Sequence, residues 1–125
     1  FAQWSGGTFI ALRISNVHVA ADYAAVPGYQ QDYAQRRWNL WGYVDARDVA
    51  QACRKAVTAD LDGAHSFVIA AADTLMEASN TELLDDQFPG IEVRGDIGEH
   101  KTLLSIDRAR ELLGYDPEHS WRDQI

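Results

Sequence analysis

The stretch TFIALRI, from Thr8 to Ile14, decides the fold class. It is rich in β-branched and other apolar residues and is largely apolar on both faces, which is typical of a strand buried inside a sheet. Residues 66–71, SFVIAA, form a second run of this kind, and residues 91–94, IEVR, alternate like a strand with one exposed face. The sequence therefore predicts at least three strands.

Helical patterns lie before and between these strands. Residues 1–4 predict the last turn of a helix that Gly6-Gly7 stops. Apolar residues then recur at helical spacing from residue 49 to residue 57, with Asp45 or Asp48 as the N-terminal cap and LDG, residues 61–63, as the end.

Two more helices are predicted toward the C-terminus. One is capped within residues 79–82 and stops at residues 89–90, and the other is capped by Ser105 or Asp107 and closed by Gly114. The alternation of strands and helices predicts an α/β fold with at least some parallel pairing. Because no linker or repeat divides the chain, we expect one continuous unit over residues 1–125.

Composition limits the classes of partner. The 125 residues include 11 Lys and Arg against 19 Asp and Glu, which gives a net charge of −8 and would repel a nucleic-acid backbone. The apolar runs fall far short of the roughly 20 residues that a membrane span needs. Neither nucleic acid nor a membrane is therefore expected as a partner. One cysteine, Cys53, excludes a disulfide framework, indicates a cytoplasmic location and is itself expected to be a small core residue.

The connection between the first strand and the next helix is long and rich in aromatic residues. Residues 16–40 have no regular pattern, with Pro27-Gly28 as a turn, and their tyrosines argue for order rather than disorder. Trp38, Trp41 and Tyr43 then gather around one short extended segment. Such rings can stack on a sugar or a base, and the alternative is a core packed beneath the loop.

No complete catalytic signature is present. The glycine spacing of a phosphate-binding loop, Gly-x-Ser-x-Gly, His-Glu-x-x-His and Tyr-x-x-x-Lys are all missing, so no catalytic residue is assigned. Asp45 and Asp48 could be paired acid and base carboxylates, although helix capping explains them better.

The histidines do not predict a metal site. His18 and Asp22 could share a metal ion, but no third ligand is indicated, and no metal-binding residue is assigned. We expect His65, His100 and His119 to be solvated surface side chains.

Three motifs in a fixed order resemble a known family. ALRISNV, residues 11–17, followed by YVDARDVA, residues 43–50, resembles the C-terminal part of the extended short-chain dehydrogenases, the NAD-dependent epimerase/dehydratase family that acts on nucleotide sugars. SIDRARELLGYDP, residues 105–117, is similar to the closing helix of that family. The resemblance spans nearly the whole chain and implies the last sheet strands of a Rossmann-like fold plus a small substrate-binding lobe.

The resemblance also implies site residues. Ile14 and Val17 would border the nicotinamide of the cofactor, and Asn16 would hydrogen-bond the phosphate side of the substrate. His18 stands where the family has a tyrosine, and Trp41 stands where nucleotide-sugar members have an arginine that binds pyrophosphate. Both are candidate substrate-binding residues, and the substitution at Trp41 leaves room for an uncharged substrate.

A fourth substrate-binding candidate is Arg94. The segment Arg94-Gly95-Asp96 corresponds to a phosphate-binding Arg-x-Gly-Asp of the family with one residue lost.

The family places its glycine-rich loop and its Tyr-x-x-x-Lys pair before the strand that matches residues 8–14. Because the chain opens at Phe1 and its only methionine is Met76, we expect the C-terminal portion of a longer enzyme. That parent, expected to be a homodimer, would convert a sugar or nucleotide sugar with NAD or NADP. The present chain would lack the NAD-binding half, bind neither cofactor alone and be inactive by itself.

Two rival interpretations remain open. The first is a free-standing domain that binds a small ligand or a protein through residues 38–43. The second is a proteolytic remnant without a role of its own, which a large exposed apolar patch would favour.

Overall fold

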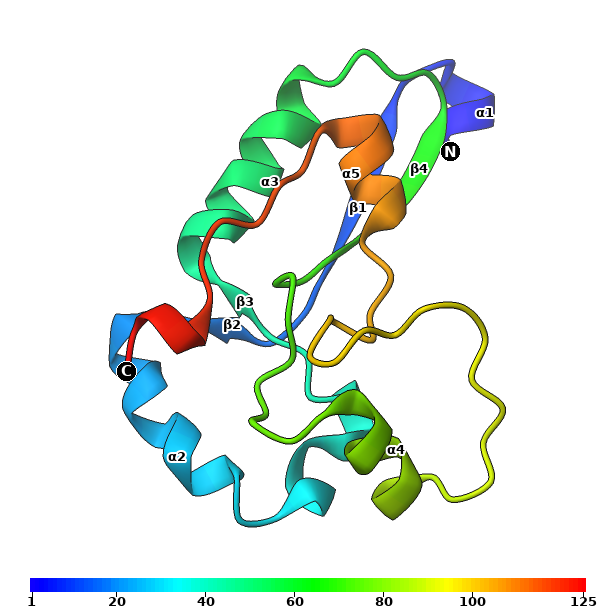
Figure 1. Cartoon of the computed structure of the whole chain (residues 1–125). Coiled ribbons are helices and arrows are strands. Elements are labelled where there is room, and N and C mark those ends of the chain that lie inside the picture. The colour runs from blue at the N-terminus through cyan, green and yellow to red at the C-terminus, as the bar shows by residue number, and fades with distance from the viewer.

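The computed structural model describes residues Phe1 to Ile125 as a mixed α/β fold with small parallel sheets and several helices (Figure 1). The elements in chain order are α1 (Ala2–Ser5), β1 (Phe9–Ile14), β2 (Val17–His18), η1 (Ala20–Ala25), α2 (Val26–Tyr29), η2 (Tyr33–Asn39), β3 (Val44–Asp45), α3 (Ala46–Thr58), β4 (Ala64–Ile69), α4 (Asn80–Gln87), α5 (Asp107–Leu113) and η3 (Trp121–Asp123), where η marks a 3-10 helix.

Two parallel strand pairs form the centre of the molecule. β1 pairs with β4 from Phe9 opposite Ala64 to Ile14 opposite Ile69, and β2 pairs with β3. The pairs are linked, because the Ser15 amide donates to the Ile69 carbonyl at 2.9 Å. β1 and β4 run side by side away from the end of the molecule that holds α1, so their carboxyl ends meet near the middle, whereas β2 and β3 run together toward the start of α3 (Figure 1). The predicted α/β class with parallel pairing is therefore confirmed.

One face of the β1–β4 pair is covered by α3 and α5. Leu12 lies opposite Phe67, and both pack into a core that includes Ala52 of α3 and Ala109 of α5. Residues opposite one another in a parallel pair share a face of the sheet. Burying these apolar side chains fixes both helices on this one face.

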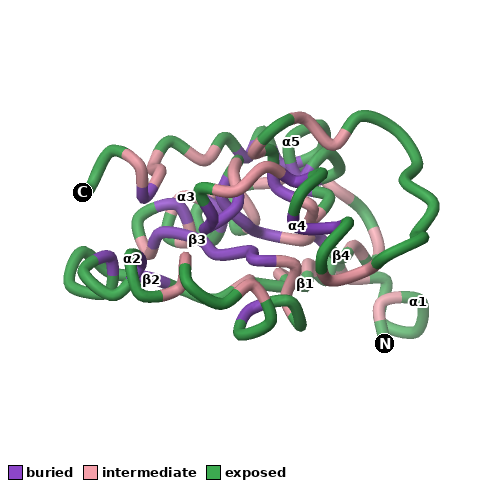
Figure 2. Tube along the Cα trace, turned by 60° about the horizontal axis from the view of Figure 1, so that its bottom comes forward, coloured by how far each residue is buried: buried purple, intermediate pink, exposed green.

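The other face of the pair is open, which corrects the expectation that residues 8–14 form a strand buried on both sides. Phe9, Ala11 and Arg13 alternate with the core-facing residues and are exposed, and Ala64 and Ser66 of β4 are exposed beside them. No residue of β1 is fully buried, as Figure 2 also shows. The run is apolar on both sides, but no helix of this chain covers the second side.

Local capping signals place most of the helices correctly. Asp45 caps α3 by accepting the Arg47 amide at 2.8 Å, Ser79 caps α4 by accepting the Glu82 amide at 3.2 Å, and Gly114 ends α5 with φ of 67°. The cap predicted for α5 is wrong. Ile106 occupies that position, and no side chain bonds to the free amides.

Three further expectations are also wrong. Residues 91–94 form no strand and are exposed, because no partner strand lies beside them. α3 ends at Thr58, before LDG. Cys53 is exposed, because the buried side of α3 is set by Asp48 and Ala52.

The long connection after β1 is ordered and mostly helical. η1, α2 and η2 occupy most of residues 20–39, and the expected turn at Pro27-Gly28 lies inside α2. Tyr23 and Val26 pack with Trp121 near the C-terminus in a second core cluster. Burial of these rings explains why a segment without regular periodicity is ordered.

Candidate functional site

The main candidate site is a groove at the carboxyl ends of β1 and β4, the edge where ligands of open parallel sheets commonly bind. It has a volume of about 460 Å³. Its lining residues are Arg13, Ile14, Ser15, Asn16, Trp38, Asn39, Val68 and Leu104. They come from the end of β1, the end of η2, β4 and the segment before α5, so segments far apart in the sequence meet here.

A tight backbone turn after η2 shapes one side of the groove. Leu40 and Trp41 both adopt the left-handed conformation, with φ of 52° and 54°, which is uncommon for residues other than glycine. A Cβ atom at the next residue, Gly42, would lie 2.5 Å from Leu104 Cδ1. Glycine therefore lets Leu104 pack closely against the turn and reach the groove.

This turn separates the two tryptophans of the aromatic segment. Trp38 is 75% exposed at the groove, whereas Trp41 is fully buried and its indole N–H donates to the Tyr33 carbonyl at 2.9 Å. Trp41 presents no surface to a ligand, so the substrate contact expected of it has no basis in this geometry. Its burial, and that of Tyr43, agrees with the alternative of a core beneath the loop.

Asn16 and His18 form a pair at the end of β1. Asn16 Nδ2 lies 3.2 Å from Nε2 of His18, which is 3% exposed and packs against the rings of Tyr23 and Tyr43. Burial, assisted by nearby Arg36, lowers the pKa of His18. The neutral ring then accepts the Asn16 amide hydrogen at Nε2, which leaves the second amide hydrogen and the carbonyl oxygen of Asn16 for a ligand.

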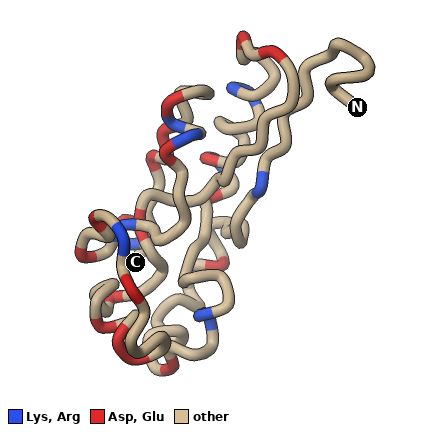
Figure 3. The backbone as a smooth tube through the Cα atoms, turned by 90° about the vertical axis from the view of Figure 1, so that its right-hand side faces the viewer, with Lys and Arg blue, Asp and Glu red and all other residues tan.

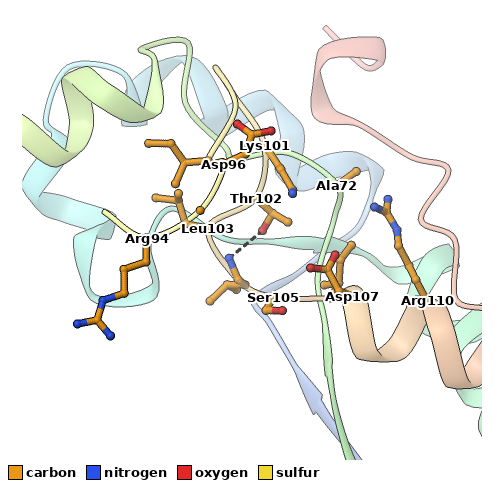
Figure 4. Close-up of a pocket in the computed structure, with 13 residues that line it drawn as sticks. Ala72, Arg94, Asp96, Lys101, Thr102, Leu103, Ser105, Asp107 and Arg110 are labelled. Atoms are coloured by element: carbon orange, nitrogen blue, oxygen red, sulfur yellow. Dashed lines mark hydrogen bonds between the residues drawn. The ribbon is translucent and has the colours of Figure 1, made fainter. Parts of the chain in front are cut away.

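A second hollow of about 370 Å³ adjoins the first, because Leu104 lines both (Figure 4). Lys101, Asp107 and Arg110 lie around it, and neither cation forms an ion pair. Arg94 also lines this hollow, but in Figure 4 its guanidinium points away from Lys101 and Arg110. It pairs at 3.4 Å with Glu92, and both side chains are largely exposed.

The residues implied by the family resemblance are only partly brought together. Ile14 and Asn16 line the groove, and His18 supports Asn16 from behind. Val17 is 46% exposed but lies outside the groove lining. Arg94 belongs to the adjoining hollow.

Two carboxylates with little exposure to solvent, Asp73 and Asp48, hold the C-terminal segment against the rest of the fold through hydrogen bonds. Asp73 accepts hydrogen bonds from Tyr43 Oη at 2.7 Å and Ser120 Oγ at 2.7 Å, and it pairs with Arg122. Burial, with Asp73 nearby, raises the pKa of Tyr43. The sequence gives no signal for this hydrogen-bond network, because Asp73 lies at least 30 residues from each of its partners.

Asp48 forms the second set of hydrogen bonds to the C-terminal segment. It accepts the backbone amides of Glu118 and His119 at 3.1 Å, and its Oδ1 lies 2.8 Å from His119 Nδ1. This corrects the expectation that His119 is simply solvated. Asp45 has different partners, because it accepts hydrogen bonds from Arg47 and Tyr23, so the two carboxylates are bound separately in the fold.

Charges are dispersed over the molecule. Figure 3 shows Lys and Arg at several places along the backbone, with Asp and Glu interspersed among them. No three His, Cys, Asp or Glu side chains gather as metal ligands would. None of the helices has the length and apolar character that crossing a bilayer requires.

Comparison with protein-family models, curated proteins and solved structures found no match to this chain. The function is therefore inferred from the groove and the adjoining hollow.

Proposed function

We propose that this chain is the substrate-binding C-terminal portion of an NAD(P)-dependent epimerase, dehydratase or reductase of sugars or nucleotide sugars, built on a Rossmann-like fold. The observation that carries the proposal is the groove at the carboxyl ends of two parallel strands, lined by Ile14 and Asn16. Both residues belong to the motif that resembles the extended short-chain dehydrogenases.

The groove residues suit the two ligands of such an enzyme. Ile14, which lines the groove, is 42% exposed and offers apolar contact to a flat ring such as nicotinamide; Val17 is 46% exposed but lies outside the lining. Asn16 offers one donor and one acceptor to a substrate hydroxyl. NAD or NADP, when bound to the intact parent, accepts or returns a hydride. The present residues bind and orient the substrate and exclude water from one side.

The open face of the β1–β4 pair is the proposed contact with the NAD(P)-binding half. Ala11, Ala64 and Ser66 make it flat, because their side chains are small, and Phe9 borders it. A hollow of about 440 Å³ lies over these residues. Apolar sheet faces in α/β folds are ordinarily covered by helices, which this chain does not supply here.

Ligand binding by the chain itself tests the proposal. The ¹⁵N-labelled protein is titrated with UDP-glucose, D-glucuronate and NAD while backbone amide shifts are followed by NMR. We expect a sugar compound to shift residues 13–16 and 38–39, no saturable shift with NAD, and no NAD reduction by the chain alone. Turnover by the chain alone, or shifts confined to residues outside both hollows, would overturn the proposal.

A second candidate function is a protein interaction domain without catalysis. The exposed cluster of Phe1, Trp4 and Phe9 favours it, because Phe1 lies 4.9 Å from the Phe9 ring and 5.5 Å from the Trp4 ring. In the same titration, this function predicts no response of the groove to any sugar compound.

A further inference from the structure

We propose that Trp38 is the stacking platform of the groove and that the group it receives is the neutral ring of a sugar. The inference rests on the proposed function, and it names the part of the substrate that the groove recognises and the side chain that selects it.

The position of Trp38 is the first support. Its indole is 75% exposed at the groove, although Trp41, three positions later, is fully buried. The two consecutive left-handed residues at Leu40 and Trp41 maintain this difference, because they reverse the chain between the two rings. A large flat ring held open at the mouth of a hollow suits stacking on the face of a ligand ring.

The polar groups of the groove are the second support. Asn16, held by His18 Nε2 at 3.2 Å, keeps one donor and one acceptor available. Two further lining residues, Ser15 and Asn39, have side-chain oxygens that are shielded from solvent and lack hydrogen-bond partners. Neighbouring hydroxyl groups, each a donor and an acceptor, match this wall better than an aromatic ring without hydroxyls does.

The distribution of charge is the third support and determines that the ring is neutral. Arg13 is the only charged residue among the eight that line the groove. Lys101 and Arg110, the free cations nearby, line the adjoining hollow beyond Leu104. Arg13 is therefore the one cation that a phosphate or carboxylate meets in this lining, and no second cation stands beside it, so the lining suits a neutral ring better than a phosphate.

The test compares variants of the intact 125-residue chain. The probes are D-glucose, D-galactose and D-xylose, with D-glucuronate and nicotinamide mononucleotide as the competing chemistries. The four tryptophan indole N–H signals and the backbone amides are followed by NMR during each titration, and circular dichroism confirms that each variant is folded. Trp4→Ala is the matched control, because Trp4 is 82% exposed and lies outside the groove.

We expect at least one neutral sugar to shift the Trp38 indole signal. Trp38→Ala is expected to weaken binding about tenfold, Trp38→Tyr to restore most of the loss because a flat ring returns, and Trp4→Ala to leave binding unchanged. Sugar binding in the groove that survives Trp38→Ala would overturn the stacking role but leave the proposed function in place. A response of Trp38 to nicotinamide mononucleotide and to no sugar would also overturn the inference alone. If no sugar compound, UDP-glucose included, bound anywhere on the chain, both proposals would fail.

Discussion

The two faces of the β1–β4 pair are built from similar sequence and have opposite surroundings. On the closed face, Leu12 and Phe67 pack beneath α3 and α5. On the open face, Phe9 and Ala11 are exposed beside Ala64 and Ser66. Neighbouring residues of a strand point to opposite sides, so a run that is largely apolar on both faces can bury both sides. This chain fills only one of them.

The closed face of the β1–β4 pair contributes to the stability of the chain, whereas the open face remains available for binding. The closed face contains buried aromatic rings, and the hydrogen bonds of Asp73 and Asp48 hold the C-terminal segment in place. The open face and the adjoining groove contain exposed aromatic side chains that nothing in the chain covers. Substitutions on the closed side should therefore reduce the free energy of unfolding, whereas those on the open side should change association and ligand binding.

The largest expected effect comes from Phe67→Ala. Phe67 is 1% exposed, and removing its ring leaves a cavity among residues of α5, so we expect a loss of about 3–5 kcal/mol in the free energy of unfolding. Phe9→Ala is the matched variant, because Phe9 is 41% exposed on the other face, and it should cost less than about 1 kcal/mol. Urea unfolding followed by circular dichroism measures both. Equal losses would mean that the two faces do not differ in this way.

Asp73→Ala should have the next largest effect. It removes the acceptor shared by Tyr43, Ser120 and Arg122 and leaves these groups without their partner, which should cost about 2–4 kcal/mol in unfolding free energy. The control is Glu92→Gln, since the Arg94–Glu92 pair is exposed and should contribute less than about 1 kcal/mol. Comparable losses for the two variants would contradict the role assigned to the network.

The pH dependence of stability provides a smaller effect on the closed side. The side-chain hydrogen bonds of Arg47, opposed by burial, hold the pKa of Asp45 well below its usual range. A carboxylate with a lowered pKa contributes stability above its ordinary pKa near 3.9 and loses it as the pH falls further. Asp45→Asn should therefore remove about 1–2 kcal/mol near neutral pH and less in acid.

Urea midpoints measured from neutral pH to strong acid check this prediction. Asp85→Asn is the control, because Asp85 is exposed on α4 and makes no hydrogen bond through its side chain. If the difference between the wild type and Asp45→Asn were the same at every pH, the lowered pKa would not contribute to stability.

The elements that could be predicted from the sequence are those determined by neighbouring residues. Asp45, Ser79 and Gly114 mark ends of α3, α4 and α5 correctly, because a cap acts within one turn of the helix. Burial depends on distant segments. The predicted burial of Cys53 is therefore wrong. Periodicity indicates only roughly which side of a helix is buried, and in α3 the buried residues are Asp48 and Ala52. Residues 91–94 alternate like a strand but have no partner.

The candidate site was predictable to a similar extent. Ile14 and Asn16 are site residues that the family resemblance implies, and both line the groove. The exposure of Trp38 and the burial of Trp41 could not be predicted. They depend on left-handed backbone conformations at Leu40 and Trp41, and neither residue is a glycine. The contribution of Leu104 has no local signal either, since Leu104 comes from the distant segment before α5 and packs against Gly42.

The smallest expected change in stability, and a direct test of the open side, is Phe9→Ser. Phe9 packs edge-on against Phe1 at 4.9 Å but is 41% exposed, so its loss should change the free energy of unfolding by no more than about 1 kcal/mol. Apolar surface that several exposed rings share binds apolar dyes and promotes association, whereas a single exposed residue does neither to the same degree. Phe9→Ser should therefore lower the fluorescence of an added apolar dye and reduce any self-association measured by sedimentation. Val57→Ser is the matched control, because Val57 is 86% exposed on α3, and it should change neither quantity. Equal responses of the two variants would mean that the aromatic side chains at the open face are separate exposed residues and not a surface prepared for a partner.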